Sequence, residues 1–175
     1  MIKKILIALV IIIAALLVFA ATRPDSFHVQ RSASINAPTD KIFPLINDLH
    51  AWTTWSPYEK LDPDMKKAFS GSDNGVGAVY AWEGNKKAGA GRMTILQSVP
   101  DSRVNIGLEF FKPFKGNDTV DFTLDSVNGA TTVTWAMHGP NPYMAKLIGI
   151  FCNMDKLIGK DFEAGLASLK AQAEK

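Results

Sequence analysis

The sequence predicts an α+β chain in which a curved antiparallel sheet of seven strands wraps around one long C-terminal helix, preceded by a single transmembrane helix. Three features of the apolar residues predict it: an unbroken apolar run at residues 5–21, apolar–polar alternation in seven short segments between residues 27 and 138, and a helical period from Tyr143 onward. About 150 residues follow the run, enough for one domain with a sizeable core.

The apolar run at residues 5–21 contains no charged residue, no polar side chain, no Gly and no Pro. As a helix it would be about 25 Å long, enough to span the hydrocarbon core of a bilayer with little tilt. We therefore expect a stub at residues 1–4, a signal anchor at 5–21, a linker at 22–26 and a domain at 27–175. Two Lys before the run and one Arg after it favour a cytoplasmic N-terminus and a domain on the opposite side.

The alternative for the same run is a cleaved signal peptide, with cleavage after Ala20. A charged start and small residues near the cleavage site favour it. The apolar core is longer than the usual 7–15 residues, however, and the bulky Phe19 lies inside the candidate site. An uncleaved anchor is therefore the preferred interpretation.

Charge and cysteine content exclude several classes of protein. Lys3 and Lys4 account for the whole net charge of +2, so the domain carries no basic surface that would attract nucleic acid. Cys152 is the only cysteine, which excludes an internal disulfide and a cysteine-based metal cluster. It falls within an apolar helical pattern, so we expect it to be a small buried hydrophobic residue.

The first part of the domain reads as a strand followed by two short helical segments. Residues 27–35 alternate as a strand, and residues 36–40 supply the Asn, Pro, Thr and Asp typical of a helix start. A short amphipathic helix then ends near Asp48. Residues 49–57 carry two Trp residues and end in Ser-Pro, which indicates a second short helix or a turn.

The middle of the chain consists of six further strands joined by turns rich in Gly, Asn, Asp and Pro. Short, regular spacing indicates successive antiparallel hairpins. We expect the strands near residues 66–71, 76–84, 90–99, 103–111, 118–126 and 130–138.

From Tyr143 the apolar residues recur every three or four positions, which predicts one helix of roughly 30 residues with a single apolar stripe. Gly149, Gly159 and Gly165 lie within it. Each costs about 1 kcal/mol relative to Ala unless close packing or a bend makes use of it.

Short motifs along the whole domain resemble those of a known family. They lie at residues 31–38, 42–43, 47–49, 52–57, 62–63, 75–82, 89–93, 133–139 and 161–166. With these motifs in this order, residues 27–172 resemble the START-like SRPBCC superfamily, which has the helix-grip fold, and more narrowly the polyketide cyclase/dehydrase family of small bacterial proteins. Members of the superfamily include lipid carriers, hormone receptors and cyclases. They share no single catalytic signature, so the resemblance assigns no catalytic residue.

The resemblance implies a cavity between the sheet and the long helix, and strand alternation together with the helical stripe indicates which side chains face it. A filled core would produce the same pattern. The candidate lining residues are Trp52, Trp55, Tyr80, Trp82, Met93, Ile95, Ile106, Leu108, Phe110, Phe122, Trp135, Met137, Leu147, Phe151 and Met154. Trp52 and Trp55 could form a lid over the cavity or fix the short helices to the sheet, and we favour the second role.

Acid–base candidates are few. His50 lies near the presumed mouth of the cavity and is the one weak catalytic candidate, while His28 and His138 alternate with apolar neighbours and are expected on the outer face. No metal-ligand spacing, nucleotide-binding loop or Gly-x-Ser-x-Gly motif occurs, so we expect neither a metal nor another cofactor.

Three functions fit these observations. The first is a domain that binds a hydrophobic small molecule or lipid and is tethered to the periplasmic side of the bacterial inner membrane. If the signal is cleaved, the domain would instead be secreted to the periplasm. The second is a cyclase/dehydrase-like enzyme acting on an apolar or aromatic substrate. The third is a structural or partner-binding domain with a filled core. The expected partners are the membrane and an apolar ligand, with no nucleic acid and no identifiable protein partner.

Overall fold

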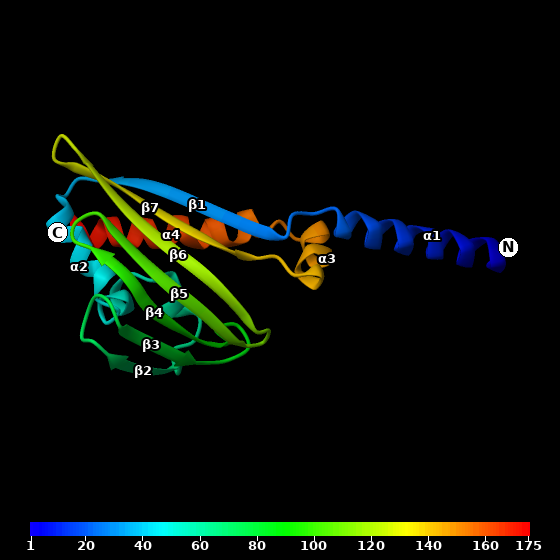
Figure 1. Cartoon of the computed structure of the whole chain (residues 1–175), viewed down its shortest axis with the longest axis horizontal. Helices are drawn as coiled ribbons and strands as arrows, with labels where there is room; N and C mark the ends of the chain where they lie inside the picture. The colour runs from blue at the N-terminus through cyan, green and yellow to red at the C-terminus, as the bar shows by residue number, and fades with distance from the viewer.

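A computed structural model describes residues 1–175. Helix α1 (Ile2–Ala21) projects from one end of a domain that holds all the other elements (Figure 1). Almost all its side chains are exposed, and it is the one helix of the chain that is long and apolar enough to cross a membrane. The same description fits an N-terminal signal sequence.

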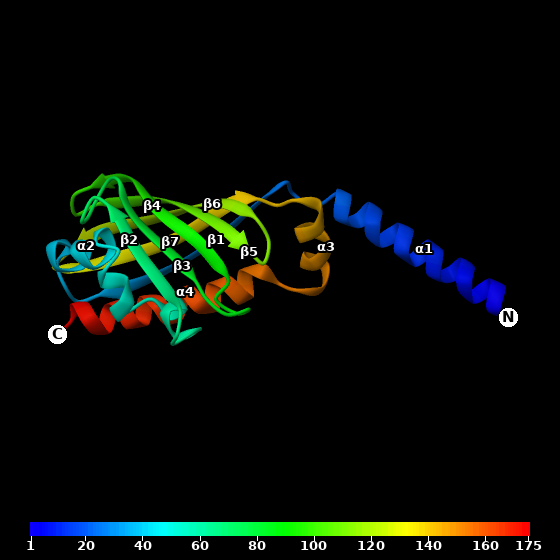
Figure 2. The same ribbon diagram turned by 90° about the horizontal axis from the view of Figure 1, so that it is seen from below.

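The domain has the predicted architecture of a seven-stranded antiparallel sheet curved around a C-terminal helix (Figures 1 and 2). The sheet order is β1-β7-β6-β5-β4-β3-β2, so the chain's first strand pairs with its last. Its elements are β1 (Ser26–Ile35), α2 (Thr39–Asn47), the 3-10 turns η1 (Ala51–Thr54) and η2 (Pro57–Lys60), β2 (Lys66–Gly71), β3 (Ala78–Glu83), β4 (Ala90–Val99), β5 (Arg103–Lys112), β6 (Gly116–Val127), β7 (Ala130–Pro140), α3 (Tyr143–Phe151) and α4 (Met154–Ala173).

The C-terminal helix is divided in two, whereas the apolar period predicts one helix of roughly 30 residues. Helix α3 ends at Phe151, and the backbone of the next residue, Cys152, is extended. Asn153 then caps α4 by accepting a hydrogen bond from the backbone N–H of Lys156 at 3.0 Å. An Asn side chain in this position satisfies a free N–H group and starts a new helix. The periodicity continues across the break, so it does not reveal the change of direction. The sequence predicts that Cys152 is buried, and this prediction is wrong, because Cys152 is exposed.

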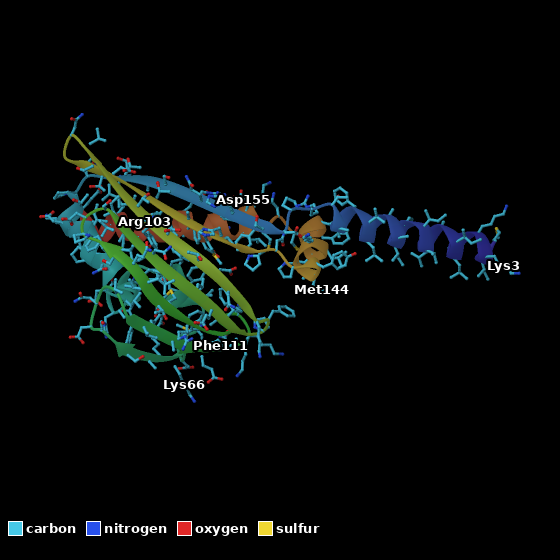
Figure 3. All side chains as sticks on the ribbon, viewed as in Figure 1. Lys3, Lys66, Arg103, Phe111, Met144 and Asp155 are labelled. Atoms are coloured by element: carbon cyan, nitrogen blue, oxygen red, sulfur yellow. The ribbon has the colours of Figure 1, made fainter.

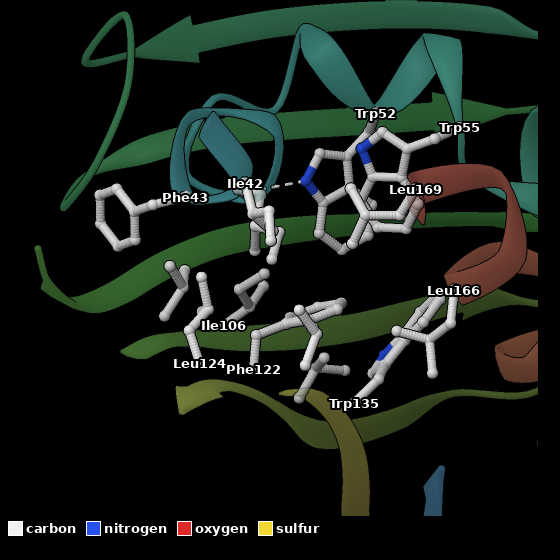
Figure 4. Packing of buried hydrophobic residues seen from close by; sticks show 14 of the residues in the cluster. Ile42, Phe43, Trp52, Trp55, Ile106, Phe122, Leu124, Trp135, Leu166 and Leu169 are labelled. Carbon is white, nitrogen blue, oxygen red and sulfur yellow. Dashed lines mark hydrogen bonds between the residues drawn. The ribbon is translucent and has the colours of Figure 1, made fainter. Parts of the chain in front are cut away.

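The core contains a cluster of aromatic side chains between the two short segments and the sheet (Figure 4). The indole N–H of Trp52 donates to the carbonyl of Ile46 at 2.9 Å, and that of Trp55 donates to Leu45 at 2.8 Å. Both rings are buried and pack edge-on against Phe122. The two Trp residues therefore fix the short helices to the sheet, as we favoured, and do not form a lid.

Helix α4 is held against the sheet by one aromatic stack and one ion-pair group. The ring of Trp135 stacks on Phe162 with 4.1 Å between centroids, and a Cβ on Gly165 would lie 2.6 Å from the same indole. Arg31 of β1 bonds to Asp155 at 3.0 Å and to Glu163 at 2.8 Å. The hydrogen bonds to the two carboxylates raise the pKa of Arg31, and the hydrogen bond from Arg31 lowers the pKa of Asp155.

Residues 22–26, which we expect to be a short linker, form hydrogen bonds and an ion pair with residues 141–146, at the start of α3. The backbone N–H of Asn141 donates to the carbonyl of Asp25 at 2.7 Å, and Lys146 forms an ion pair with the Asp25 carboxylate. The hydroxyl of Tyr143 donates to the carbonyl of Leu17 inside α1 at 2.9 Å. Helix α1 is therefore joined to the domain by specific contacts in addition to the chain itself.

The close contact at Gly165 generates a prediction. Gly165→Ala should lower the free energy of unfolding by about 1–3 kcal/mol, because the new methyl group would press on the Trp135 ring, even though Ala is the better helix former. Gly149→Ala is the matched control, since a Cβ there meets nothing within 4 Å, and it should raise stability by up to about 1 kcal/mol. Urea unfolding of the full chain in detergent, followed by Trp fluorescence, measures both. Equal effects at the two positions would contradict the packing argument.

Candidate functional site

A cavity of about 330 Å³ lies between the concave face of the sheet, the 3-10 turns and α4. Of its 19 lining residues, 15 are hydrophobic, so the space suits an apolar molecule. The lining residues are Trp52, Ser56, Tyr58, Glu59, Leu61, Met65, Tyr80, Trp82, Lys87, Ala88, Met93, Leu108, Phe110, Val120, Trp135, Met137, Ile158, Asp161 and Phe162.

The sheet's register brings the lining side chains of adjacent strands together. Met93 of β4 lies between Tyr80 of β3 and Leu108 of β5, and all three point to the concave face. In the next row Trp82 and Phe110 lie on either side of a glycine. A Cβ on that residue, Gly91, would come within 2.5 Å of the Trp82 ring, so the missing side chain lets the indole lie flat over β4.

Eight of the predicted lining residues are in the wall of this cavity. They come from η1 and from strands β3, β4, β5 and β7, where alternation along each strand sets the inward face. They are Trp52, Tyr80, Trp82, Met93, Leu108, Phe110, Trp135 and Met137.

Four others face inward but pack in a closed core beyond the cavity. Each is at most 2 % exposed, because the short helices and the second half of α4 fill this end of the concave face. They are Trp55, Ile95, Ile106 and Phe122. Alternation selects the inward face of a strand but does not show which part of that face is covered.

The last three predicted residues, Leu147, Phe151 and Met154, lie outside the cavity. The chain turns at Cys152–Asn153, and α3 lies beside the end of α1 instead of continuing along the sheet (Figure 2). Phe151 is 76 % exposed. Their placement in a cavity wall depended on one continuous helix, which the chain does not form.

Sequence reasoning missed the polar part of the wall. The Glu59 side chain is only 8 % exposed; it accepts a hydrogen bond from the Tyr80 hydroxyl at 2.7 Å and forms an ion pair with Lys67. These residues come from η2, β3 and β2, and Glu59 stands 21 positions before Tyr80. The Glu59 segment shows no period in the sequence, since a 3-10 turn of four residues is too short to produce one.

Both tyrosines of the cavity remain neutral phenols near pH 7. Burial, together with the hydrogen bond to Glu59, raises the pKa of Tyr80. Burial, with a smaller effect of the Asp161 charge, raises the pKa of Tyr58. They can therefore donate hydrogen bonds but do not serve as bases.

One donor in the cavity wall has no partner. The indole N–H of Trp135 is buried and meets no hydrogen-bond acceptor in the protein. A buried donor in this state costs about 1–3 kcal/mol relative to a bonded one. The atom is closed off from the open space of the cavity, so the cost belongs to the packing of the core.

The histidines lie away from the cavity. His50 has a carboxylate partner that the sequence does not reveal, with Nδ1 2.9 Å from the Asp48 carboxylate, and its ring stacks on Phe69. It is half exposed and is not among the residues of the cavity wall. His28 and His138 are exposed on the outer face of β1 and β7, as expected. No three His, Cys, Asp or Glu side chains form a metal-ligand group.

Three solved structures share this fold at low sequence identity. Protein CV1439 from Chromobacterium violaceum aligns with a TM-score of 0.58 and 16 % identity over 87 % of this chain and 99 % of its own. DynU16, a protein in the dynemicin biosynthetic locus, aligns with a TM-score of 0.61 and 16 % identity over 87 % of this chain and 48 % of its own. The Aha1 dimer from Colwellia psychrerythraea aligns with a TM-score of 0.55 and 17 % identity over 85 % and 96 %.

None of the curated proteins matches this chain. The family described as "Polyketide cyclase / dehydrase and lipid transport" matches residues 26–174, the whole domain after α1. The curved sheet, the helix it encloses and the cavity between them agree with the helix-grip fold that the sequence resemblance implies. The chain therefore belongs to the polyketide cyclase/dehydrase and lipid transport family.

Proposed function

We propose that this chain is a membrane-tethered, extracytoplasmic binding protein that holds a hydrophobic small molecule or a lipid in its cavity. The observation that carries the proposal is the apolar cavity between the sheet and α4. Lipid transport in the family's description is consistent with it. Binding of this kind needs no catalytic group, because each buried CH₂ contributes about 0.8 kcal/mol.

The size and polarity of the cavity narrow the ligand class. About 330 Å³ is near the lower end of ordinary small-molecule pockets, so we propose a single acyl chain, an isoprenoid or a small aromatic ring system rather than a whole two-chain phospholipid. Because 15 of the 19 lining residues are hydrophobic, we expect most of the ligand's surface to be apolar. The hydroxyl of Tyr80 is already bonded to Glu59, so it is less available.

The tether is proposed from α1 and its surroundings. Lys3 and Lys4 at the start of α1 favour a cytoplasmic N-terminus, which places the domain on the other side of the membrane. Ala20 is fully buried, although almost all of α1 is exposed, and Asp25 is bonded to Lys146 of α3. Such contacts on both sides of the candidate cleavage site support an uncleaved anchor.

Filling the cavity should abolish binding. Leu108→Trp adds a large ring to the cavity wall and should weaken binding of the co-purified apolar molecule at least about tenfold, since that volume is no longer open. Leu96→Trp is the matched control, because Leu96 is an exposed residue on β4 outside the cavity. Native mass spectrometry of full chain extracted from membranes, with lipid analysis of the released molecule, compares the two. If both variants keep the ligand, or if the natural protein carries none and binds none in a lipid panel, the carrier proposal fails.

The tether has its own test. The mature protein should begin at its natural N-terminus and remain with the membrane after carbonate extraction. In a Cys152→Ser background, Ser72→Cys should react with a membrane-impermeant maleimide in intact spheroplasts, since Ser72 is exposed in the turn between β2 and β3. A mature N-terminus at Ala21 would indicate signal-peptide cleavage, and labelling only after lysis would place the domain in the cytoplasm.

The second candidate function is a cyclase/dehydrase-like enzyme, and the Glu59–Tyr80 pair is the observation that favours it. A buried carboxylate next to a neutral phenol in an apolar cavity is an arrangement that can exchange a proton with a bound substrate. His50 cannot take this role, because it does not reach the cavity.

An enzyme of this kind should depend on Glu59. Glu59→Gln should reduce kcat by about 10²–10⁴ for any reaction of the bound molecule, while the affinity for that molecule changes little. Product formation from the co-purified ligand, measured by mass spectrometry, is the readout, and His50→Ala is the control expected to keep full activity. Turnover that survives Glu59→Gln would remove Glu59 as the acid–base group.

A further inference from the structure

Helix α3 and the first turn of α4 expose a row of large apolar side chains to solvent. On α3 these side chains are three or four residues apart and therefore share one helix face. Phe151 is 76 % exposed and Leu157 is 58 % exposed, which is unusual for side chains of this size in one cluster. We call the following set the α3–α4 face: Met144, Ile148, Phe151, Met154 and Leu157.

On the opposite side of α3, Lys146 is turned toward the protein. Lys146 is only 7 % exposed, and its ammonium group pairs with Asp25, just after the end of α1. The hydrogen bond from Lys146, together with its charge, lowers the pKa of Asp25. Helix α3 is thus amphipathic with its polarity reversed relative to a helix of a soluble domain, because its apolar side chains face outward.

Helix α3 also lies at a defined position along α1. The Tyr143 hydroxyl donates to the carbonyl of Leu17, four residues before the end of α1, which corresponds to about 6 Å along the helix axis. Figure 3 shows Met144 beside this end of α1, with Lys3 at the other end of the helix. If α1 spans the bilayer, α3 lies at the depth where interfacial helices bury their apolar faces, roughly 5–10 Å below the headgroup boundary.

We propose that the α3–α4 face inserts into the outer part of the leaflet from which α1 emerges, so that the domain lies on the membrane surface instead of moving freely on its tether. The proposal rests on the membrane tether proposed above and adds a second membrane contact to it. Lipid is the occupant because the face is continuous with the exposed apolar surface of α1, which lipid must already cover. A folded protein partner would have to share that surface with the bilayer.

This placement brings the cavity close to the lipid. Ile158, directly after Leu157, lines the cavity, and so does Asp161 one turn further along α4. Phe114, in the turn between β5 and β6, is 77 % exposed. That turn lies at the same end of the domain as α3 (Figure 1). The first turns of α4 thus separate the cavity from the bilayer, and an apolar ligand would have a short path between the two.

The single cysteine provides a direct test, because Cys152 is exposed at the α3–α4 junction. The full chain is labelled there with a nitroxide in detergent and reconstituted into phosphatidylcholine/phosphatidylglycerol vesicles. The ratio of oxygen to nickel-chelate collisions, measured by EPR, reports the depth of the label. The control carries Cys152→Ser with Val127→Cys, in the exposed hairpin between β6 and β7 at the end of the domain far from α1 (Figure 1).

We expect the oxygen-to-nickel ratio at residue 152 to be at least about five times the ratio at residue 127, because the label at residue 152 would lie below the headgroups. Met144→Gln, Phe151→Gln and Leu157→Gln together should bring the ratio at residue 152 down to that of the control. These side chains are exposed, so the fold should be retained, which Trp fluorescence checks.

The outcomes separate this proposal from the one it rests on. If the protein floats with the vesicles and keeps its ligand, but the label at residue 152 is in water, the membrane-docked arrangement is overturned. The proposal of a tethered carrier would still stand. If the oxygen-to-nickel ratio shows that the label is in water and the spectrum shows dipolar broadening between two labels, the α3–α4 face is a contact between two copies of the chain. This result also overturns the proposal. Protein that does not float with the vesicles contradicts both the tether and the docking.

Discussion

The stack of Trp135 on Phe162 is the contact on which the arrangement of sheet and helix depends. The two rings lie 4.1 Å apart and nearly parallel, and Gly165, one turn further along α4, lets the helix approach the indole closely. Here β7 and α4 touch directly, whereas the first turns of α4 stand away from strands β3 to β5. The cavity occupies that space, and Trp135 and Phe162, which form the stack, also line it.

The same constraint explains why only one end of the concave face is open. Trp52 and Trp55, each bonded to a main-chain carbonyl of α2, fill the far end together with Phe122 (Figure 4). Along β5 the inward residues Val104 and Ile106 are completely buried, while the later inward residues face the cavity. The same strands therefore line a closely packed core at one end and the open cavity at the other. The side chains of the domain fill only part of the space inside the sheet.

The chemistry of the cavity is consistent with the binding function that we propose. Its wall is mainly apolar, its two tyrosines remain protonated near pH 7, and its one buried carboxylate is already engaged by a phenol and an ammonium group. Groups held in this way restrict the orientation of a bound molecule through hydrogen bonds. The ion pairs of Arg31 with Asp155 and Glu163 join β1 to α4, so these charges fix the helix rather than the ligand.

The sequence by itself determined the order of the elements, the inward and outward faces of the strands and the apolar N-terminal helix, because each depends on the periodicity of neighbouring residues. Only the tertiary structure decided which inward residues line the cavity, since Phe110 and Ile106 have the same alternation but different neighbours. It also decided the turn at Asn153, where one side-chain cap redirects an otherwise continuous apolar period, and the meeting of Glu59 with Tyr80. These features depend on contacts between residues distant in the chain or on one local hydrogen bond, and neither leaves a period in the sequence.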